Sequence, residues 1–119
     1  MIVVRITLNV FPEKHLELMQ TLLSIAEPTQ KDEGCLTCEV FCDMQDKNRL
    51  RLLQEWRDRE DLDYHMMSNR FSVLLGTNTL LSEPLEIRID TVTRTEGMEA
   101  VAAARGNKAS QPTQRRLFS

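Results

Sequence analysis

The stretch from Glu55 to Phe71 gathers the side chains of this sequence that are best suited to chemistry. It contains the only Trp, the only Tyr and one of the two His residues. An imidazole can change its protonation near neutral pH without help from a cofactor, so His65 is a candidate acid, base or hydrogen-bonding group. Trp56 precedes it in the same stretch and is a candidate wall for the same site.

Two elements must position these residues. The apolar run that ends at Trp56 is typical of a strand, and Asp58 is a favoured residue for capping the helix that follows. Leu62, His65 and Met66 then fall on one face of that helix. We therefore expect Trp56 and His65 to line the same side of the fold.

A purely structural interpretation of the same residues stays open. His65 can be a helix histidine at the edge of the core, with Asp61 one turn earlier as its partner. Trp56 is then an ordinary core residue, and His15, early in another helix, is a solvated surface residue. Asn9 ends the first strand among polar residues, where a role in capping or in a turn is expected.

Three cysteines form the pattern C-x2-C-x3-C, the one group in the sequence that resembles a metal site. Positions three apart on a strand face opposite sides, so Cys35 can join Cys38 only if the turn continues past Gly34. Cys38 and Cys42 instead fit the alternation that starts at Leu36, as small buried side chains. We expect no metal site.

The hydrophobic pattern predicts four strands and three helices. Apolar residues alternate with polar ones from Ile2 to Val10, and helical spacing follows Pro12, a favoured first helical residue. Strands are expected at residues 1–10, 36–42, 49–56 and 85–93, and helical segments at residues 12–28, 58–67 and 68–78. The order β-α-β-β-α-β is that of a ferredoxin-like α+β domain, with one antiparallel four-stranded sheet and its helices on one face.

The second face of such a sheet has no cover within one chain. Apolar and charged side chains are mixed on it, namely Val3, Phe41, Leu53 and Val92 with Arg5, Arg51, Glu55 and Arg88. A half-apolar sheet face of this kind is an association surface. We infer a homodimer with two-fold symmetry, packed sheet against sheet.

Composition excludes several classes of function. The chain has 119 residues, a net charge of -3 and charges of both signs interspersed, so no basic field attracts nucleic acid. It lacks a signal-peptide pattern and any apolar run of the roughly 20 residues that a membrane helix needs. Three Cys, an odd number, favour a reducing, cytoplasmic setting over a secreted one.

The sequence divides into a domain at residues 1–95 and a C-terminal tail at residues 96–119. The segment from Met98 to Arg105 is rich in Ala and can form a short helix. The rest of the tail is polar and is expected to be irregular or held by a partner subunit.

Several segments, in this order and spacing, resemble the antibiotic biosynthesis monooxygenase family. They are the turn Asp32-Glu33-Gly34-Cys35-Leu36 before a strand, the segment Glu55-Trp56 followed by His65 in the pattern E-W-x8-H, and then Ser68-Asn69-Arg70-Phe71. The likeness covers roughly residues 1–95. It implies a dimeric α+β barrel made of two ferredoxin-like subunits with facing sheets.

The resemblance also implies an activity. It is the oxidation of a small aromatic or quinol-type compound by O2, without metal, flavin or haem as cofactor. On this hypothesis His65 accepts or shares the substrate proton and Asn9 offers an amide to the developing oxyanion. Trp56, Phe71, Leu62 and Met66 form the substrate-binding walls.

Other functions remain open beside this one. Relatives in the family degrade haem, and others isomerise small phosphorylated carbonyl compounds, for which Arg57, Arg59 and Arg70 are candidate anchors. A non-catalytic dimeric module that binds small molecules would need the same apolar pocket but no titrating base.

Overall fold

The computed structural model describes residues 1–106 and confirms the predicted α+β fold. Its strands are β1 (Ile2–Asn9), β2 (Cys35–Cys42), β3 (Arg49–Trp56) and β4 (Glu86–Thr91). Its helices are α1 (His15–Thr29), α2 (Arg59–Met66), α3 (Asn69–Gly76) and α4 (Met98–Ala104), with 3-10 turns at Pro12–Lys14 and Thr77–Leu80. The expectation for the irregular end of the tail concerns residues 107–119 and lies outside the described residues.

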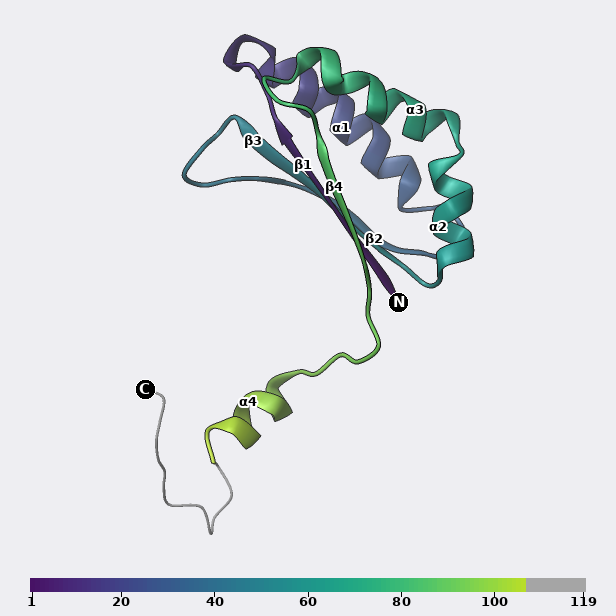
Figure 1. The fold of residues 1–119 in the computed structure, drawn as a ribbon, viewed down its shortest axis with the longest axis vertical. Coiled ribbons are helices and arrows are strands. Elements are labelled where there is room, and N and C mark those ends of the chain that lie inside the picture. Colours follow the sequence, from purple (N-terminus) through teal and green to yellow (C-terminus); the bar gives the residue numbers. More distant parts are fainter. Residues whose placement is uncertain (107–119) are drawn as a thin grey trace.

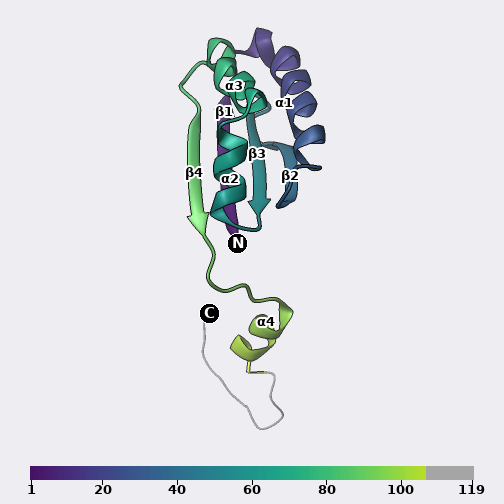
Figure 2. The ribbon, with the colours of Figure 1, turned by 90° about the vertical axis from the view of Figure 1, so that its right-hand side faces the viewer.

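The four strands form one antiparallel sheet in the order β2-β3-β1-β4 (Figure 1). Helices α1, α2 and α3 all pack on one face of this sheet, as Figures 1 and 2 show from two sides. The core lies between the two layers and is built from the inward positions of the strands and the apolar faces of α1, α2 and α3. Ile6, Leu8, Leu18, Leu22 and Leu52 are completely buried there, as expected for period-two strands facing period-3.6 helices.

Local signals explain where the helices begin and end. The Asp58 carboxylate accepts a hydrogen bond from the backbone N–H of Asp61 at 3.0 Å, and the Ser68 hydroxyl accepts one from Phe71 N–H at 3.2 Å. Both are N-cap bonds of the expected kind. Helix α3 ends at Gly76. These caps make α2 and α3 separate helices and fix the orientation of the residues between them.

One part of the β2 prediction is wrong. The alternation that starts at Leu36 predicts that Leu36 shares a face with Cys38, but Leu36 is 54% exposed. The register shifts between Cys35 and Thr37, so that Cys35 lies opposite Trp56 and Thr37 opposite Glu55. This β-bulge accommodates Leu36 as an extra residue and turns Cys35 to the same side as Cys38.

The C-terminal segment leaves the sheet after β4. Figures 1 and 2 show α4 beyond the end of the sheet, away from the three packed helices. Met98 and Val101 on this helix are exposed. Among the described residues, no helix is both long and apolar enough to cross a membrane.

Candidate active site

His65 is held in the core at the inner face of α2. Its side chain is 2% exposed, and Leu62, one turn earlier on the same face, is completely buried. The cap at Asp58 fixes where α2 begins and therefore which face carries His65 inward. A titratable ring in this position has lost almost all of its contact with water.

Two aromatic rings enclose the imidazole. The Trp56 ring lies with its centroid 4.9 Å from that of His65, and the Phe71 ring contacts it edge-on at 5.6 Å. Trp56 comes from the end of β3 and Phe71 from the first turn of α3. Three elements therefore meet at His65, and the predicted proximity of Trp56 and His65 is confirmed.

Gln54 completes the enclosure from β3. It is completely buried, and its side-chain oxygen accepts a hydrogen bond from Trp56 Nε1 at 2.9 Å. Its side-chain nitrogen lies 3.7 Å from Cys38 Sγ and 3.5 Å from His65 Nε2. Gln54 lies two residues before Trp56, on the same inward face of β3, and is not among the predicted site residues. A buried amide among apolar positions is the signal that could have identified it.

The opposite nitrogen of His65 faces Asp32. His65 Nδ1 lies 3.5 Å from Asp32 Oδ2, and Arg70 Nη1 donates to the same carboxylate oxygen at 2.7 Å. The expected pairing of His65 with Asp61 is wrong, because the Asp61 carboxylate accepts a hydrogen bond from Arg57 at 2.8 Å. Asp32 reaches the site from the turn between α1 and β2, a contact that helical spacing alone does not reveal.

Burial sets the charge of His65. Loss of solvation lowers the pKa of His65 below its usual 6.5, the neighbouring Asp32 carboxylate acts in the opposite direction, and Arg70 lowers the pKa further. The lowered pKa favours the neutral form of the ring at pH 7. We call Asp32, Gln54, Trp56, His65, Arg70 and Phe71 together the His65 cluster.

A hollow opens on the outer side of this cluster. Its volume is about 440 Å³, and its walls come from the α1–β2 turn, the end of β3 and the α2–α3 corner. The residues that line it are Asp32, Glu33, Trp56, Asp61, Tyr64, His65, Met67, Ser68, Asn69 and Arg70. Leu62, Met66 and Phe71, expected as substrate-binding walls, do not line the hollow: Leu62 and Phe71 belong to the buried core, and Met66 packs against that core.

Asn9 is not brought to the cluster. Along the sheet, Trp56 pairs with Ile2, whereas Asn9 pairs with Arg49 at the other end of the same strands. Seven residues of strand separate the two positions by about 23 Å. The Asn9 amide accepts a hydrogen bond from Arg49 Nε at 3.1 Å and donates one to Glu83 at 3.3 Å. Within this chain, Asn9 and His65 therefore cannot contact the same small molecule.

The cysteines show no arrangement typical of a metal site. No group of three or more His, Cys, Asp or Glu residues in the described chain could hold an ion. Burial raises the pKa of Cys35 to about 11 and that of Cys38 to about 12, so both are neutral thiols. Cys38 is buried as expected, whereas Cys42 is exposed.

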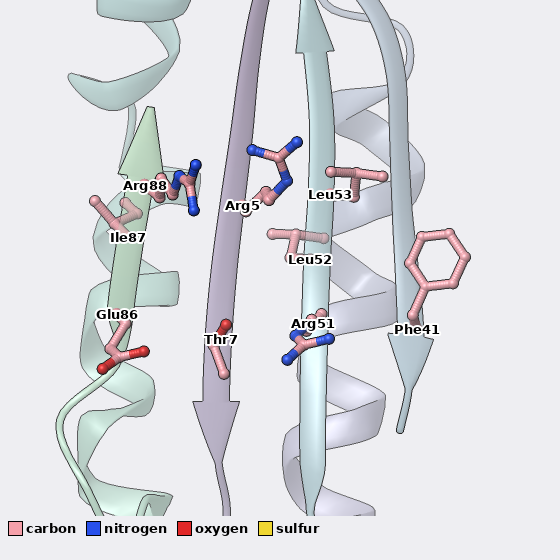
Figure 3. A pocket seen from close by; sticks show the side chains of 9 residues that line it. All are labelled: Arg5, Thr7, Phe41, Arg51, Leu52, Leu53, Glu86, Ile87 and Arg88. Atoms are coloured by element: carbon pink, nitrogen blue, oxygen red, sulfur yellow. The ribbon is translucent and has the colours of Figure 1, made fainter. Parts of the chain in front are cut away.

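A larger hollow, of about 870 Å³, lies on the other face of the sheet (Figure 3). Its lining mixes apolar and charged side chains, which are Arg5, Thr7, Phe41, Arg51, Leu52, Leu53, Glu86, Ile87 and Arg88. It contains no residue of the His65 cluster. Size alone therefore does not make it the candidate site. It marks the open sheet face.

Comparison with known proteins gives a consistent family likeness. The sequence model of the antibiotic biosynthesis monooxygenase family matches residues 1–74, which include the whole His65 cluster. A Synechocystis protein, sll1783, is 29% identical over 96 residues, covering 80% of this chain but only 65% of that protein. The chain thus spans slightly less than two thirds of that relative.

Solved structures resemble the fold closely. A conserved protein from Methanosarcina mazei Go1 is 33% identical, with a TM-score of 0.71 over 75% of this chain and 89% of that one. A crystal structure described as an antibiotic biosynthesis monooxygenase is 21% identical, with a TM-score of 0.72 over 79% of this chain and 100% of that one. The second likeness bears on the fold alone.

Proposed function

Because this chain belongs to the antibiotic biosynthesis monooxygenase family, we propose that it is a cofactor-independent monooxygenase that oxidises a small aromatic or quinol-type compound with O2. The observation that carries the proposal is the His65 cluster. A neutral, almost fully buried imidazole lies between two aromatic rings, at the wall of a hollow and 3.5 Å from a carboxylate. Such a site can bind an aromatic ring and handle one proton.

In the proposed reaction the protein has to bind the substrate and transfer its proton. An electron-rich aromatic that has lost its hydroxyl proton can itself transfer electrons to O2, so the protein must bind, orient and stabilise the anion. For a simple hydroquinone, the balanced reaction converts one hydroquinone and one O2 into one hydroxyquinone and one water. One oxygen atom of O2 enters the hydroxyquinone, the other leaves as water, and the substrate supplies all four electrons.

The cluster divides these tasks among its members. His65 and Asp32 together share the proton of the substrate hydroxyl, since both line the hollow and the imidazole Nδ1 lies 3.5 Å from the carboxylate. Arg70 holds the Asp32 carboxylate in place at 2.7 Å and adds positive charge beside the developing anion. Trp56 forms an apolar wall of the hollow, and the Phe71 ring contacts the imidazole edge-on.

We further propose that the open sheet face packs against a second copy of this chain. The face combines exposed Phe41 and partly exposed Leu53 with ion pairs from Arg5 and Arg88 to Asp90. Light scattering coupled to size-exclusion chromatography should give a mass of twice 13.8 kDa. Leu53→Arg should lower the mass to that of a monomer. A wild-type mass of 13.8 kDa would rule out the dimer.

A cytoplasmic setting is part of the same proposal. Cys35, Cys38 and Cys42 are all unpaired thiols, as is usual for proteins in a reducing compartment.

Of the three arginines considered as anchors for a phosphorylated substrate, only Arg70 lines the hollow. Arg57 and Arg59 are instead paired with acidic residues on the surface.

Oxygen uptake tests the activity. Purified, metal-free protein is assayed with a panel of hydroquinones and polyphenols, beside His65→Ala and the matched control His15→Ala. We expect uptake above autoxidation in the wild type and in the control, and uptake near background in His65→Ala. If all three proteins stay at background across the panel, the monooxygenase proposal fails. Haem titration, isomerase assays and ligand-induced thermal stabilisation then test the remaining alternatives.

A further inference from the structure

Gln54 is a buried polar residue of the His65 cluster, and neither the packing of the core nor the proposed reaction explains why an amide stands at this position. Its side chain is completely buried on the packed face of the inner strand β3, near the end of that strand. Burial of an amide is costly unless its donors and acceptor are used. The side chain is therefore expected to be fixed by its three contacts with Trp56, Cys38 and His65.

The chemistry of the three partners determines which way the amide points. An indole nitrogen can only donate, so the group 2.9 Å from Trp56 Nε1 must be the Gln54 oxygen. The NH2 group then points to Cys38 Sγ and His65 Nε2. If the amide were reversed, two donors would face each other at Trp56. The indole thus fixes the orientation of the amide, independently of how amide oxygen and nitrogen are assigned.

The same logic extends to the imidazole. A neutral imidazole has one protonated and one unprotonated nitrogen, and the nitrogen that faces the Gln54 NH2 group must supply a lone pair. His65 Nε2 is that nitrogen, although the contact is long at 3.5 Å. The ring hydrogen is then on Nδ1, which is buried, has no hydrogen-bond partner within the described residues and faces Asp32.

We propose that Gln54 is a positioning residue that holds neutral His65 in the tautomer with its hydrogen on Nδ1, so that the ring offers an N–H donor toward Asp32 and the hollow. This step rests on the proposed function: once the substrate oxygen is an anion, His65 Nδ1–H donates a hydrogen bond to it. Asp32 is then the member of the pair with a lone pair free to accept. The site selects compounds that present an ionised or acceptor oxygen at this point.

The groups around the ring are few and can be separated by substitution. Asp32 faces Nδ1 from the α1–β2 turn, and Arg70 approaches the same carboxylate from α3. On the other side, Cys38 from β2 contacts Gln54 and is a neutral thiol. Only Asp32 competes with Gln54 as the group that could set the tautomer.

Nitrogen-15 NMR of the imidazole side chains tests the proposal in the full-length wild-type chain at neutral pH. Protonated and unprotonated ring nitrogens have well separated shifts, and the spectrum of His15→Gln assigns the two histidines. We expect the Nδ1 signal of His65 in the protonated range and the Nε2 signal in the unprotonated range. The opposite pattern in the wild type overturns the proposal without any variant of the cluster.

Two variants then separate Gln54 from Asp32. Gln54→Met has nearly the same shape but neither donor nor acceptor, and we expect His65 to lose its exclusive Nδ1–H form. Asp32→Asn should retain that form, because Gln54 is intact. A Gln54→Met spectrum like the wild type, or loss of the Nδ1–H form in Asp32→Asn, would assign the control to Asp32 and overturn the proposal. If Gln54→Met does not fold, the wild-type and Asp32→Asn spectra still decide.

Oxygen uptake gives a separate result. With the wild-type tautomer confirmed, Gln54→Met should lower turnover while substrate binding changes less, since the ring remains but its hydrogen is misplaced. If the wild-type protein consumes no O2 with any compound, the proposed function fails while the spectra still decide the role of Gln54. The two failures are therefore distinguishable.

Discussion

Replacing Trp56 by Phe should destabilise the protein through the hydrogen bond as well as through lost volume. Trp56 is completely buried and donates to Gln54 at 2.9 Å. Phe keeps an aromatic ring beside His65 but leaves the buried Gln54 oxygen without its donor, which costs about 1–3 kcal/mol. The smaller ring adds a packing loss of about 1 kcal/mol. We expect the free energy of unfolding to fall by roughly 2–4 kcal/mol.

A double-mutant cycle isolates the hydrogen-bond part. In Gln54→Met there is no amide oxygen to leave unpaired, so adding Trp56→Phe should cost only the packing term. The loss in free energy of unfolding in the double variant should therefore be smaller than the sum of the two single losses by about 1–3 kcal/mol.

Urea unfolding followed by circular dichroism measures the cycle, because the variant lacks the only Trp of the chain as a fluorescent probe. Protein concentration is held fixed, since a dimer makes stability depend on it. Additivity within about 0.5 kcal/mol would refute the reasoning. Trp56 and Gln54 would then not be coupled, and the orientation of the amide would lose its support.

Two further predictions follow from the same region. Because burial lowers the pKa of His65 below 6.5, the unfolded chain binds this proton first as the pH falls. The contribution of His65 to the free energy of unfolding is therefore fully present above about pH 6.5 and is lost toward lower pH. The free energy of unfolding falls through this group by at most about 1.4 kcal/mol per pH unit. His65→Gln should remove that part of the slope in urea titrations between about pH 7.5 and 5.5, and His15→Gln should keep it; equal slopes in both would contradict the assignment. Gly34→Ala should destabilise by about 1–3 kcal/mol, because Gly34 has φ +79° and an added Cβ would collide with the Asp61 side chain. A thermal melt like that of the wild type would show that the turn can relax.

The sequence predicts the fold well where one local pattern governs an element. Period-two apolar positions identify β1 and β3, and Asp58 marks the start of α2 that the structure has. The same alternation puts Leu36 on the wrong side, because a bulge adds one residue to the strand and alternation carries no sign of such an insertion. Periodicity thus gives the element but not each side chain within it.

The candidate site was predictable only in part, for the same physical reason. Trp56 and His65 are joined by a short local segment, so their proximity follows from the strand and the helix. Asp32 lies in the α1–β2 turn and Arg70 in α3, so the contacts of Asp32 with His65 and with Arg70 depend on how these elements pack. Asn9 belongs to the strand next to that of Trp56, but the antiparallel register places it at the opposite end.

The fate of O2 tests the central claim most directly. Wild-type protein is allowed to consume a measured amount of O2 with its best hydroquinone, and catalase is then added to the closed cell. A monooxygenase sends the second oxygen atom to water, so we predict that catalase releases no O2. If half of the consumed O2 returns, the reaction yields hydrogen peroxide by simple two-electron oxidation, and the monooxygenase account is contradicted.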